Sequence, residues 1–234
     1  MAKIEHKAEE KQIKRSLLIA FSLVSAIWLA KLIEITFQLD LSFLGIRPFT
    51  LQGLLGIITT PFVHSDLKHL FSNSAPLFLL TWILFELYRG DALKILIANW
   101  ILTGILTWFM GRDSIHIGAS GVVYSLAAFH FTSGIIKKNQ RLMTVSLLVI
   151  FIYGSLVWGI FPQFFPNENI SWESHLSGFM AGAIMAFAFK SSGPQSESYF
   201  EDESDDDDTD IPWNTPIQNN PERGTNEPSS NERV

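Results

Sequence analysis

The sequence predicts an all-α membrane protein in which six helices cross the bilayer. Its apolar residues are collected into six blocks that are largely free of charged side chains. Short polar segments separate these blocks and hold much of the Lys and Arg content of the chain. Both ends of the chain are polar, so the membrane signal lies in the middle of the sequence.

The lengths of the blocks fit membrane helices, which need about 20 apolar residues and at least about 17. The blocks span residues 16–30, 67–87, 92–110, 120–136, 142–160 and 175–189. The second, third and fifth meet this length, the fourth is marginal and the sixth is short. The first meets it if the helix continues to Phe37 through Lys31 and Glu34, which are three residues apart and can form an ion pair.

The basic residues predict the orientation, because Lys and Arg in short loops resist translocation. They precede the first block, join the second to the third and the fourth to the fifth, and follow the sixth. The alternate joints hold only Arg47, Lys68 and Arg112. We therefore expect a multi-pass protein of the cell (inner) membrane with both termini in the cytoplasm. No small-residue cleavage site follows the first block, so we expect the first helix to remain in the mature protein.

Three parts of the chain are predicted. Residues 1–15 form a basic cytoplasmic arm, residues 16–190 form the six-helix domain, and residues 191–234 form a disordered acidic cytoplasmic tail. The tail holds the run from Glu201 to Asp208, which supplies much of the net charge of −6. It is also rich in Pro, Asn, Ser and Gly, and this composition buries too little apolar surface to offset the entropy of ordering.

Three polar clusters lie at the starts of predicted membrane helices, where a charged group is disfavoured by about 2.5 to 3.5 kcal/mol on insertion scales. The clusters are His64, His69 and Asn73; Gly118 to Gly121 with Tyr124; and Ser174 with His175. The predicted topology places all three toward the outer face of the membrane. The fourth helix covers roughly 25 Å of a core of about 30 Å, and the sixth is shorter still. We therefore expect a recessed, water-filled site.

Small residues predict a close contact between the fourth and sixth helices. Gly178 and Gly182 are four residues apart on one face of the sixth helix, and Gly121 and Ser125 form a matching strip on the fourth. Faces of this kind allow two helix backbones to approach closely. The contact would bring the two polar helix starts together.

The residue types in the three clusters suit nucleophilic catalysis. A serine hydroxyl needs a base to take its proton, and histidine titrates near neutrality, so we predict Ser120 as nucleophile and His175 as general base. His69 and Asn73 share one helix face, from which they can donate hydrogen bonds to an oxyanion. Tyr124 lies four residues after Ser120, where its ring can pack on the imidazole of His175. No Asp or Glu stands at an obvious position to complete a triad, so we predict a dyad.

Supporting roles follow for the glycines. Gly118 and Gly121 leave the backbone around the predicted nucleophile free of side-chain bulk, which suits substrate approach and donation by backbone N–H groups. Taken singly, each polar residue of the clusters has a commoner structural explanation, such as a hydrogen bond between helices. We assign only structural roles to His116 in its loop and to His130 within the fourth helix, where no partner for it is evident.

These residues resemble the motifs of the rhomboid family of intramembrane serine proteases. Residues 116–124 contain a G-x-S-G pattern like that of the family's nucleophile, and residues 174–182 resemble its catalytic histidine followed by a glycine-spaced helix. Residues 64–73 read H-x-x-x-x-H-x-x-x-N, similar to the pattern of its second helix, and His64 opens this pattern. The resemblance covers roughly residues 16–190, with the three motifs in the family's order.

The resemblance implies a six-helix rhomboid bundle, a Ser–His dyad without cofactor or metal, and an oxyanion site near His69, Asn73 and the Ser120 amide. It implies single-pass transmembrane proteins in the bilayer as substrates, cleaved near the outer face. No nucleic-acid partner is expected, and the oligomeric state is left open.

The resemblance also implies a first outer loop that is partly embedded in the outer leaflet. Residues 45–63 fit this loop, since they are apolar yet interrupted by Pro48, Gly53, Gly56 and Pro61. Many family members carry a Trp-Arg pair here, whereas residues 54–57 of this chain read Leu-Leu-Gly-Ile.

Two other functions are compatible with part of these observations. One is a rhomboid-like protein without proteolytic activity that acts as a membrane chaperone or dislocation factor, although such a protein is expected to lack the serine or the histidine. The other is a small-solute transporter or channel, which would explain the polar residues in the membrane. The sequence lacks the paired broken helices in two similar halves that mark transporters with inverted repeats.

Overall fold

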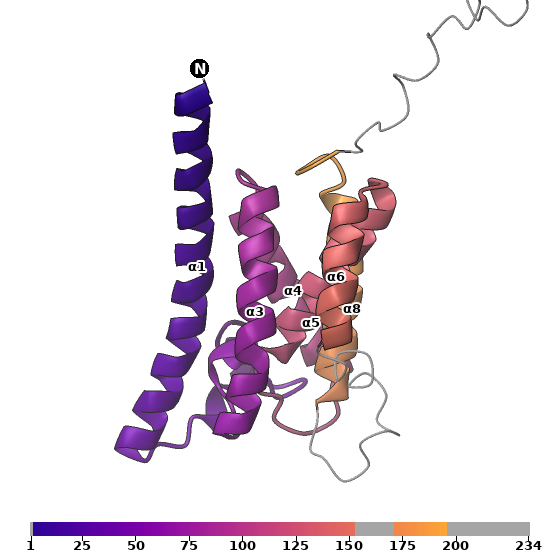
Figure 1. Ribbon diagram of the computed structural model, residues 1–234. Helices are drawn as coiled ribbons and strands as arrows, with labels where there is room; N and C mark the ends of the chain where they lie inside the picture. Colours follow the sequence, from indigo (N-terminus) through magenta and orange to yellow (C-terminus); the bar gives the residue numbers. More distant parts are fainter. Residues whose placement is uncertain (1, 153–170, 196–234) are drawn as a thin grey trace, which may run out of the picture. The chain divides into compact units, whose positions relative to one another are not determined.

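A computed structural model of the protein describes residues 2–152 and 171–195, which form helices joined by loops. The elements are α1 (Ala2–Phe37), η1 (Ser42–Leu44), α2 (Leu51–Thr59), η2 (Thr60–Phe62), α3 (Leu67–Leu87), α4 (Ala92–Met110), α5 (Ser120–Ile136), α6 (Gln140–Ile152) and α8 (Trp172–Ala188) (Figure 1). The predicted all-α membrane fold is confirmed. The end of the fifth predicted helix and the tail from residue 196 lie outside the described residues.

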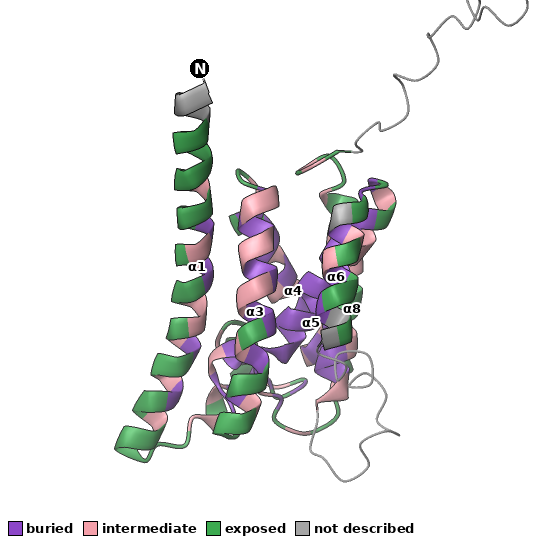
Figure 2. Ribbon diagram, viewed as in Figure 1, coloured by how far each residue is buried: buried purple, intermediate pink, exposed green. Residues whose placement is uncertain are grey.

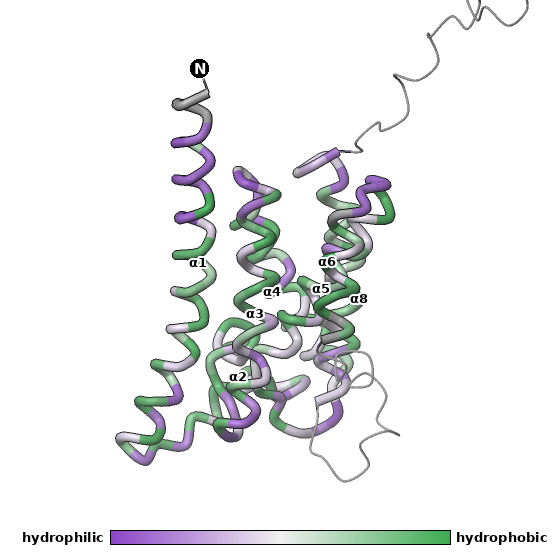
Figure 3. The backbone as a smooth tube through the Cα atoms, in the orientation of Figure 1, coloured by the Kyte–Doolittle hydropathy of each residue, from purple (hydrophilic) through white to green (hydrophobic). Residues whose placement is uncertain are grey.

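Three helices among the described residues are long and apolar enough to cross a membrane. They are residues 6–37 of α1 together with α3 and α4 in full. Figure 3 shows apolar residues along the middle of these helices and hydrophilic residues in the first turns of α1. The bounds of α3, α4 and α5 agree with the second, third and fourth predicted blocks.

The basic arm is continuous with the first membrane helix. α1 runs without a break from Ala2 to Phe37, so the described part of the predicted arm, residues 2–15, does not form a separate element. Near the end of α1, the Lys31 Nζ donates to Glu34 Oε2 at 2.9 Å, as the spacing predicts. The same ammonium donates to the backbone carbonyls of His64 at 2.8 Å and Ser65 at 3.2 Å. A buried lysine therefore joins α1 to the segment that leads into α3.

The first loop is more regular than the sequence predicts. Gly53 and Gly56, which we expected to interrupt it, lie inside α2. A Cβ at Gly53 would be 1.9 Å from the carbonyl oxygen of Arg47, and one at Gly56 would be 2.4 Å from that of Gly45. The glycines are thus required by close packing of α2 on the preceding chain, and they do not break the helix.

α5 is the central helix, and α8 packs along it. Every residue of α5 from Ser120 to His130 is buried, as the colouring of Figure 2 shows. A Cβ at Gly178 would lie 2.2 Å from the carbonyl oxygen of Gly121, and one at Gly182 would lie 2.1 Å from that of Ser125. The predicted contact between the two small-residue strips is confirmed.

The predicted length of the sixth membrane helix is wrong. α8 begins at Trp172 rather than His175 and has 17 residues, the same number as α5. In its first turn the carbonyl of Ser171 accepts from the amides of Ser174 and His175, and Glu173 is buried against Arg112, a partner distant in sequence. The depth of His175 therefore does not follow from a short helix.

Residues 191–195, predicted as the start of a disordered tail, lie against the ends of the helices. The Lys137 ammonium donates to the carbonyl of Ser192, whose hydroxyl donates to Asp91 Oδ2 at 2.8 Å. The backbone at Gly193 packs on the ring of Tyr88, since a Cβ there would be 2.6 Å from ring carbons. The boundary predicted at residue 190 therefore falls inside the packed part of the chain.

Candidate active site

Ser120 and His175 are hydrogen-bonded to each other. His175 Nε2 lies 2.9 Å from Ser120 Oγ, although the residues are 55 positions apart in sequence. Ser120 is the first residue of α5, and His175 lies in the first turns of α8, so the packing of the two helices brings these residues together. Both residues are 8% exposed, which leaves the pair buried but close to a surface.

Tyr124 stacks on the histidine, in the position that the sequence predicts. The two ring centroids are 4.2 Å apart and the planes are nearly parallel, with an angle of 13°. Because Tyr124 is one turn after Ser120 on α5, its ring holds the imidazole on the side of the helix that carries the hydroxyl. Stacking of this kind restricts rotation of the histidine side chain.

His69 and Asn73 of α3 lie beside the backbone that precedes Ser120. Gly118 has a φ of +109°, a conformation that residues with a side chain rarely adopt. A Cβ at Gly118 would be 2.7 Å from His69 Cε1 and 3.8 Å from Asn73 Nδ2. The Asn73 Nδ2 is buried without a hydrogen-bond partner among the described residues. Buried polar groups nearly always have a hydrogen-bond partner, so the unpaired Asn73 Nδ2 requires an explanation.

His64 borders the same backbone. Its Nε2 accepts from the amide of Ala119 at 3.4 Å, and its ring meets the ring of His69 edge-on with centroids 5.2 Å apart. Burial, followed by the charges of His69 and Lys31, lowers the pKa of His64 to about 3. His64 is therefore neutral at physiological pH and acts here as an acceptor that fixes the turn before Ser120.

The comparison with protein families agrees with this geometry. The family described as "Rhomboid domain" matches residues 52–192, which is more than half of the chain. The protein belongs to the rhomboid family. The matched region begins in α2, contains all eight site residues predicted from the sequence, and ends after α8.

Three curated proteins are similar in sequence to this chain, and two of them have names that include rhomboid. The chain is 31% identical over 170 residues to an uncharacterized protein of Mycobacterium tuberculosis, covering 70% of this chain and 71% of the relative. It is 28% identical over 145 residues to the "Putative rhomboid protein L523" of Acanthamoeba polyphaga mimivirus, covering 60% and 78%. It is 27% identical over 139 residues to the "Putative rhomboid protease YdcA" of Bacillus subtilis, covering 56% and 65%.

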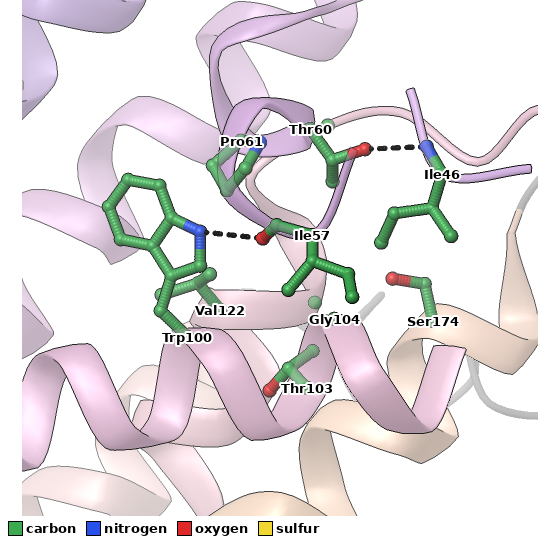
Figure 4. A pocket seen from close by; sticks show the side chains of 11 residues that line it. Ile46, Ile57, Thr60, Pro61, Trp100, Thr103, Gly104, Val122 and Ser174 are labelled. Carbon is green, nitrogen blue, oxygen red and sulfur yellow. Dashed lines mark hydrogen bonds between the residues drawn. The ribbon is translucent and has the colours of Figure 1, made fainter. Parts of the chain in front are cut away.

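A small cavity of the rhomboid domain lies behind the serine turn (Figure 4). Its volume is about 10 Å³, close to the smallest that holds one water molecule. Its walls come from the first loop, α4, α5, α8 and the segment before α5, and they include Gly118, Gly121 and Ser174. The Trp100 Nε1 donates to the carbonyl of Ile57 at 3.1 Å, which ties the first loop to α4 at this wall.

Sequence reasoning missed the contacts of His116. This loop histidine is 1% exposed and forms a two-way backbone bridge with Ile46, with N–O distances of 2.9 and 2.8 Å. Its carbonyl also accepts from Thr60 Oγ1 at 2.8 Å. The Gly118 amide donates to the carbonyl of Thr60 at 3.2 Å. The first loop is thus bound to the segment that leads to Ser120.

Sequence reasoning also missed Glu173 and a partner of His130. Glu173 lies two residues before His175 and is 2% exposed, with Arg112 as its ion-pair partner. An acidic residue beside the apolar block was a signal for a buried ion pair.

His130 Nε2 lies 3.2 Å from the carbonyl oxygen of Leu80, so this histidine joins α5 to α3 away from the serine.

Proposed function

We propose that this rhomboid protein is an intramembrane serine endopeptidase, with Ser120 as nucleophile and His175 as general base. The observation that carries the proposal is the 2.9 Å contact between Ser120 Oγ and His175 Nε2. A serine hydroxyl within hydrogen-bond reach of an imidazole, which is itself oriented by a third group, is the arrangement of an activated nucleophile. Tyr124 supplies the orienting contact.

The reaction follows from these positions. His175 Nε2 takes the proton as Ser120 Oγ attacks the peptide carbonyl, and the carbonyl oxygen becomes an oxyanion. The protonated imidazole then gives its proton to the departing amine, which leaves an acyl group on Ser120. Water, deprotonated by the same imidazole, releases the acyl group and restores the enzyme.

The oxyanion is held by the donors gathered beside Gly118. The Asn73 amide, the His69 ring and the backbone amide of Ser120 are assigned to this role. The Asn73 Nδ2 supports the assignment, because it has no hydrogen-bond partner among the described residues and so breaks no bond to them when it donates to the oxyanion.

The substrates are single-pass transmembrane proteins that reach the site from the bilayer. The enzyme lies in the cell (inner) membrane with both termini in the cytoplasm, and the site opens toward the outer face. The asymmetric distribution of Lys and Arg in the loops supports this orientation. A rhomboid-like chaperone without proteolytic activity would gain nothing from a hydrogen-bonded serine and histidine at a shared site.

The proposal is tested by reaction with a fluorophosphonate, which modifies only an activated serine. The purified protein in detergent is expected to be labelled and to cleave a transmembrane substrate. Ser120→Ala and His175→Ala are expected to lose both properties. Ser22→Ala is the matched control, because Ser22 also lies in a membrane helix but its hydroxyl donates to the carbonyl of Leu18, four residues earlier in the same helix, at 2.7 Å. Labelling or cleavage that survives in Ser120→Ala contradicts the proposal.

A further inference from the structure

Two polar contacts join the segment before Ser120 to the start of α8. The Arg112 Nη1 donates to both carboxylate oxygens of Glu173, at 3.0 and 3.1 Å. The His116 Nδ1 lies 2.5 Å from Ser171 Oγ. We call these two contacts the polar link. It connects residues 112–116, which lead into α5, with residues 171–173, which lead into His175.

The ion pair of the polar link is buried on its acidic side. The Glu173 side chain is 3% exposed and that of Arg112 is 45% exposed. A buried carboxylate without a partner is strongly destabilising, so Arg112 is required to keep Glu173 where it is. A neighbouring ion pair differs: Arg47 and Asp113 are 3.4 Å apart with side chains 53% and 83% exposed. Exposed pairs of this kind contribute little.

The second contact of the polar link, between His116 and Ser171, takes the place of the usual side-chain cap at the start of α8. Ser171 is the N-cap residue of α8, where a serine side chain usually accepts from a backbone amide of the first turn. Here it makes no capping hydrogen bond, and its hydroxyl faces His116 instead. The Ser171 carbonyl accepts from the amides of Ser174 at 3.1 Å and His175 at 3.3 Å. Displacement of Ser171 would therefore displace the backbone of His175.

The segment of the polar link that leads to Ser120 is also held by the first loop. The His116 backbone is bridged to Ile46, and the Gly118 amide donates to Thr60, so the segment that leads to Ser120 cannot shift without the first loop. The glycine contacts between α5 and α8 bring the helices together, but they do not by themselves prevent α8 from sliding or turning. The polar link supplies that restraint at the end of the helices where the reactive residues lie.

We propose that Arg112, Glu173, His116 and Ser171 are positioning residues that set the hydrogen bond between Ser120 and His175. The inference rests on the proposed protease function. It assigns these residues no contact with the substrate. They act through the place and angle of the imidazole, and a misplacement of about 1 Å at a reacting pair costs on the order of 100-fold in rate.

The test uses the full-length protein in detergent and a cycle of variants: Arg112→Gln, Glu173→Gln and the double variant. The double variant is the decisive one, because it leaves no buried charge without a partner. Asp113→Asn is the matched control, since Asp113 is adjacent to Arg112 and the variant breaks the exposed ion pair with Arg47. Each protein is measured for kcat and KM on a transmembrane substrate, for the fraction of sites that a fluorophosphonate titrates, and for thermal unfolding.

The double variant is expected to lose on the order of tenfold or more in kcat per titrated site, with KM within about twofold of the wild-type value. The loss of kcat in the double variant should not exceed the loss in the single variant with the lower kcat, because the two residues act as one unit. Asp113→Asn should match the wild type. Ser171→Ala, which breaks the second contact without a charge, should also lower kcat.

Two results would overturn the inference. One is a double variant with the wild-type kcat per titrated site, even if fewer sites are folded, since this would make the ion pair only structural. The other is single-variant losses that multiply in the double variant. Failure of the protease proposal is distinguishable, because then the wild-type protein itself would neither be labelled nor cleave the substrate.

Discussion

Gly178 of α8 meets the carbonyl oxygen of Gly121 of α5 so closely that a Cβ at position 178 would lie 2.2 Å from that oxygen. Gly121 directly follows the proposed nucleophile, and Gly178 follows the proposed base by three residues. The contact between the two glycines therefore fixes how near Ser120 and His175 come to each other. Only hydrogen is small enough for this interface.

We predict that Gly178→Ala impairs both folding and catalysis. The added methyl group has to push α8 away from α5, which costs about 1–3 kcal/mol in free energy of unfolding and lengthens the contact between Ser120 and His175. Thermal unfolding and the rate of fluorophosphonate labelling measure the two effects. Gly90→Ala is the control, since nothing lies within 4 Å of a Cβ there. Equal labelling rates for the two variants would contradict the prediction.

We predict that Asn73→Ala lowers kcat by on the order of 100-fold or more while the thermal stability stays close to that of the wild type. The Asn73 Nδ2 has no partner among the described residues, so its removal leaves no protein acceptor unpaired. Asn99→Ala is the contrast: the Asn99 side chain accepts from Ser125 Oγ at 2.6 Å and donates to the Ile95 carbonyl at 2.8 Å. It should lose stability, with a smaller effect on kcat. An Asn73→Ala variant with unchanged kcat would remove this residue from the oxyanion site.

The sequence predicted the parts of this fold that depend on local composition. α3, α4 and α5 begin and end where the largely uncharged apolar blocks do, because the hydrocarbon core of a bilayer requires about 20 predominantly apolar residues in each helix. The contact between α5 and α8 was also predictable, because glycines spaced by four are needed wherever backbones touch. The stacking of Tyr124 on His175 followed from its position one turn after Ser120.

What the sequence did not predict depends on partners distant along the chain. α8 starts at Trp172, and its first turn buries Glu173 against Arg112, which lies 61 residues earlier. From the sequence, the glycines of α2 indicate interruptions of the apolar loop, whereas in the structure they lie in a helix and allow Arg47 and Gly45 to pack against it. His116 looked like an ordinary loop residue, and only its contacts with Ile46 and Ser171 reveal its position between the two reactive segments.

We predict that Lys31→Met destabilises the protein by roughly 1–3 kcal/mol, because the variant leaves the buried carbonyl of His64 without its donor. The segment between η2 and α3 would then be held less firmly, so labelling of Ser120 should also slow. Glu34→Gln is the control, because it breaks the ion pair with Lys31 but leaves the ammonium on the carbonyl. Thermal unfolding of the two variants separates these contributions. A larger loss in Glu34→Gln than in Lys31→Met would contradict this account.

We predict that two truncations of the C-terminal end behave differently. Removal of residues 196–234 should leave substrate cleavage in detergent unchanged, because the contacts of Lys137 and Asp91 with Ser192 remain. Removal of residues 191–234 deletes those contacts and uncovers Tyr88, so the free energy of unfolding should fall by about 1–2 kcal/mol. Unfolding temperatures and cleavage rates of the two truncated proteins test this. Equal stability of the two would show that residues 191–195 contribute nothing.

The last prediction concerns which peptide bonds are cut. An intact helix keeps its carbonyl groups bonded to its own amides, so under the proposed function the peptide bond that is cut has to lie in an extended segment. Unwinding a helix in hydrocarbon exposes backbone groups at a cost of several kcal/mol each, so good substrates should carry Gly, Pro or small polar residues near the cut. A Cβ at Gly118 would lie 2.7 Å from His69 Cε1, so there is little room beside the backbone that precedes Ser120, and we expect a small residue before the bond.

A library of tagged single-pass proteins tests this, with the products identified by mass spectrometry. We expect cuts within or just outside the outer end of the helix, after a small residue, and only where the helix is weakened. A matched pair of substrates, in which Gly-Pro near the cut is replaced by Leu-Leu, separates helix weakness from the side chain before the bond. If the wild-type enzyme cuts the Leu-Leu partner equally fast, unwinding is not limiting. Cuts that cluster at the cytoplasmic end would contradict the orientation, because the site would then open to the other face of the membrane.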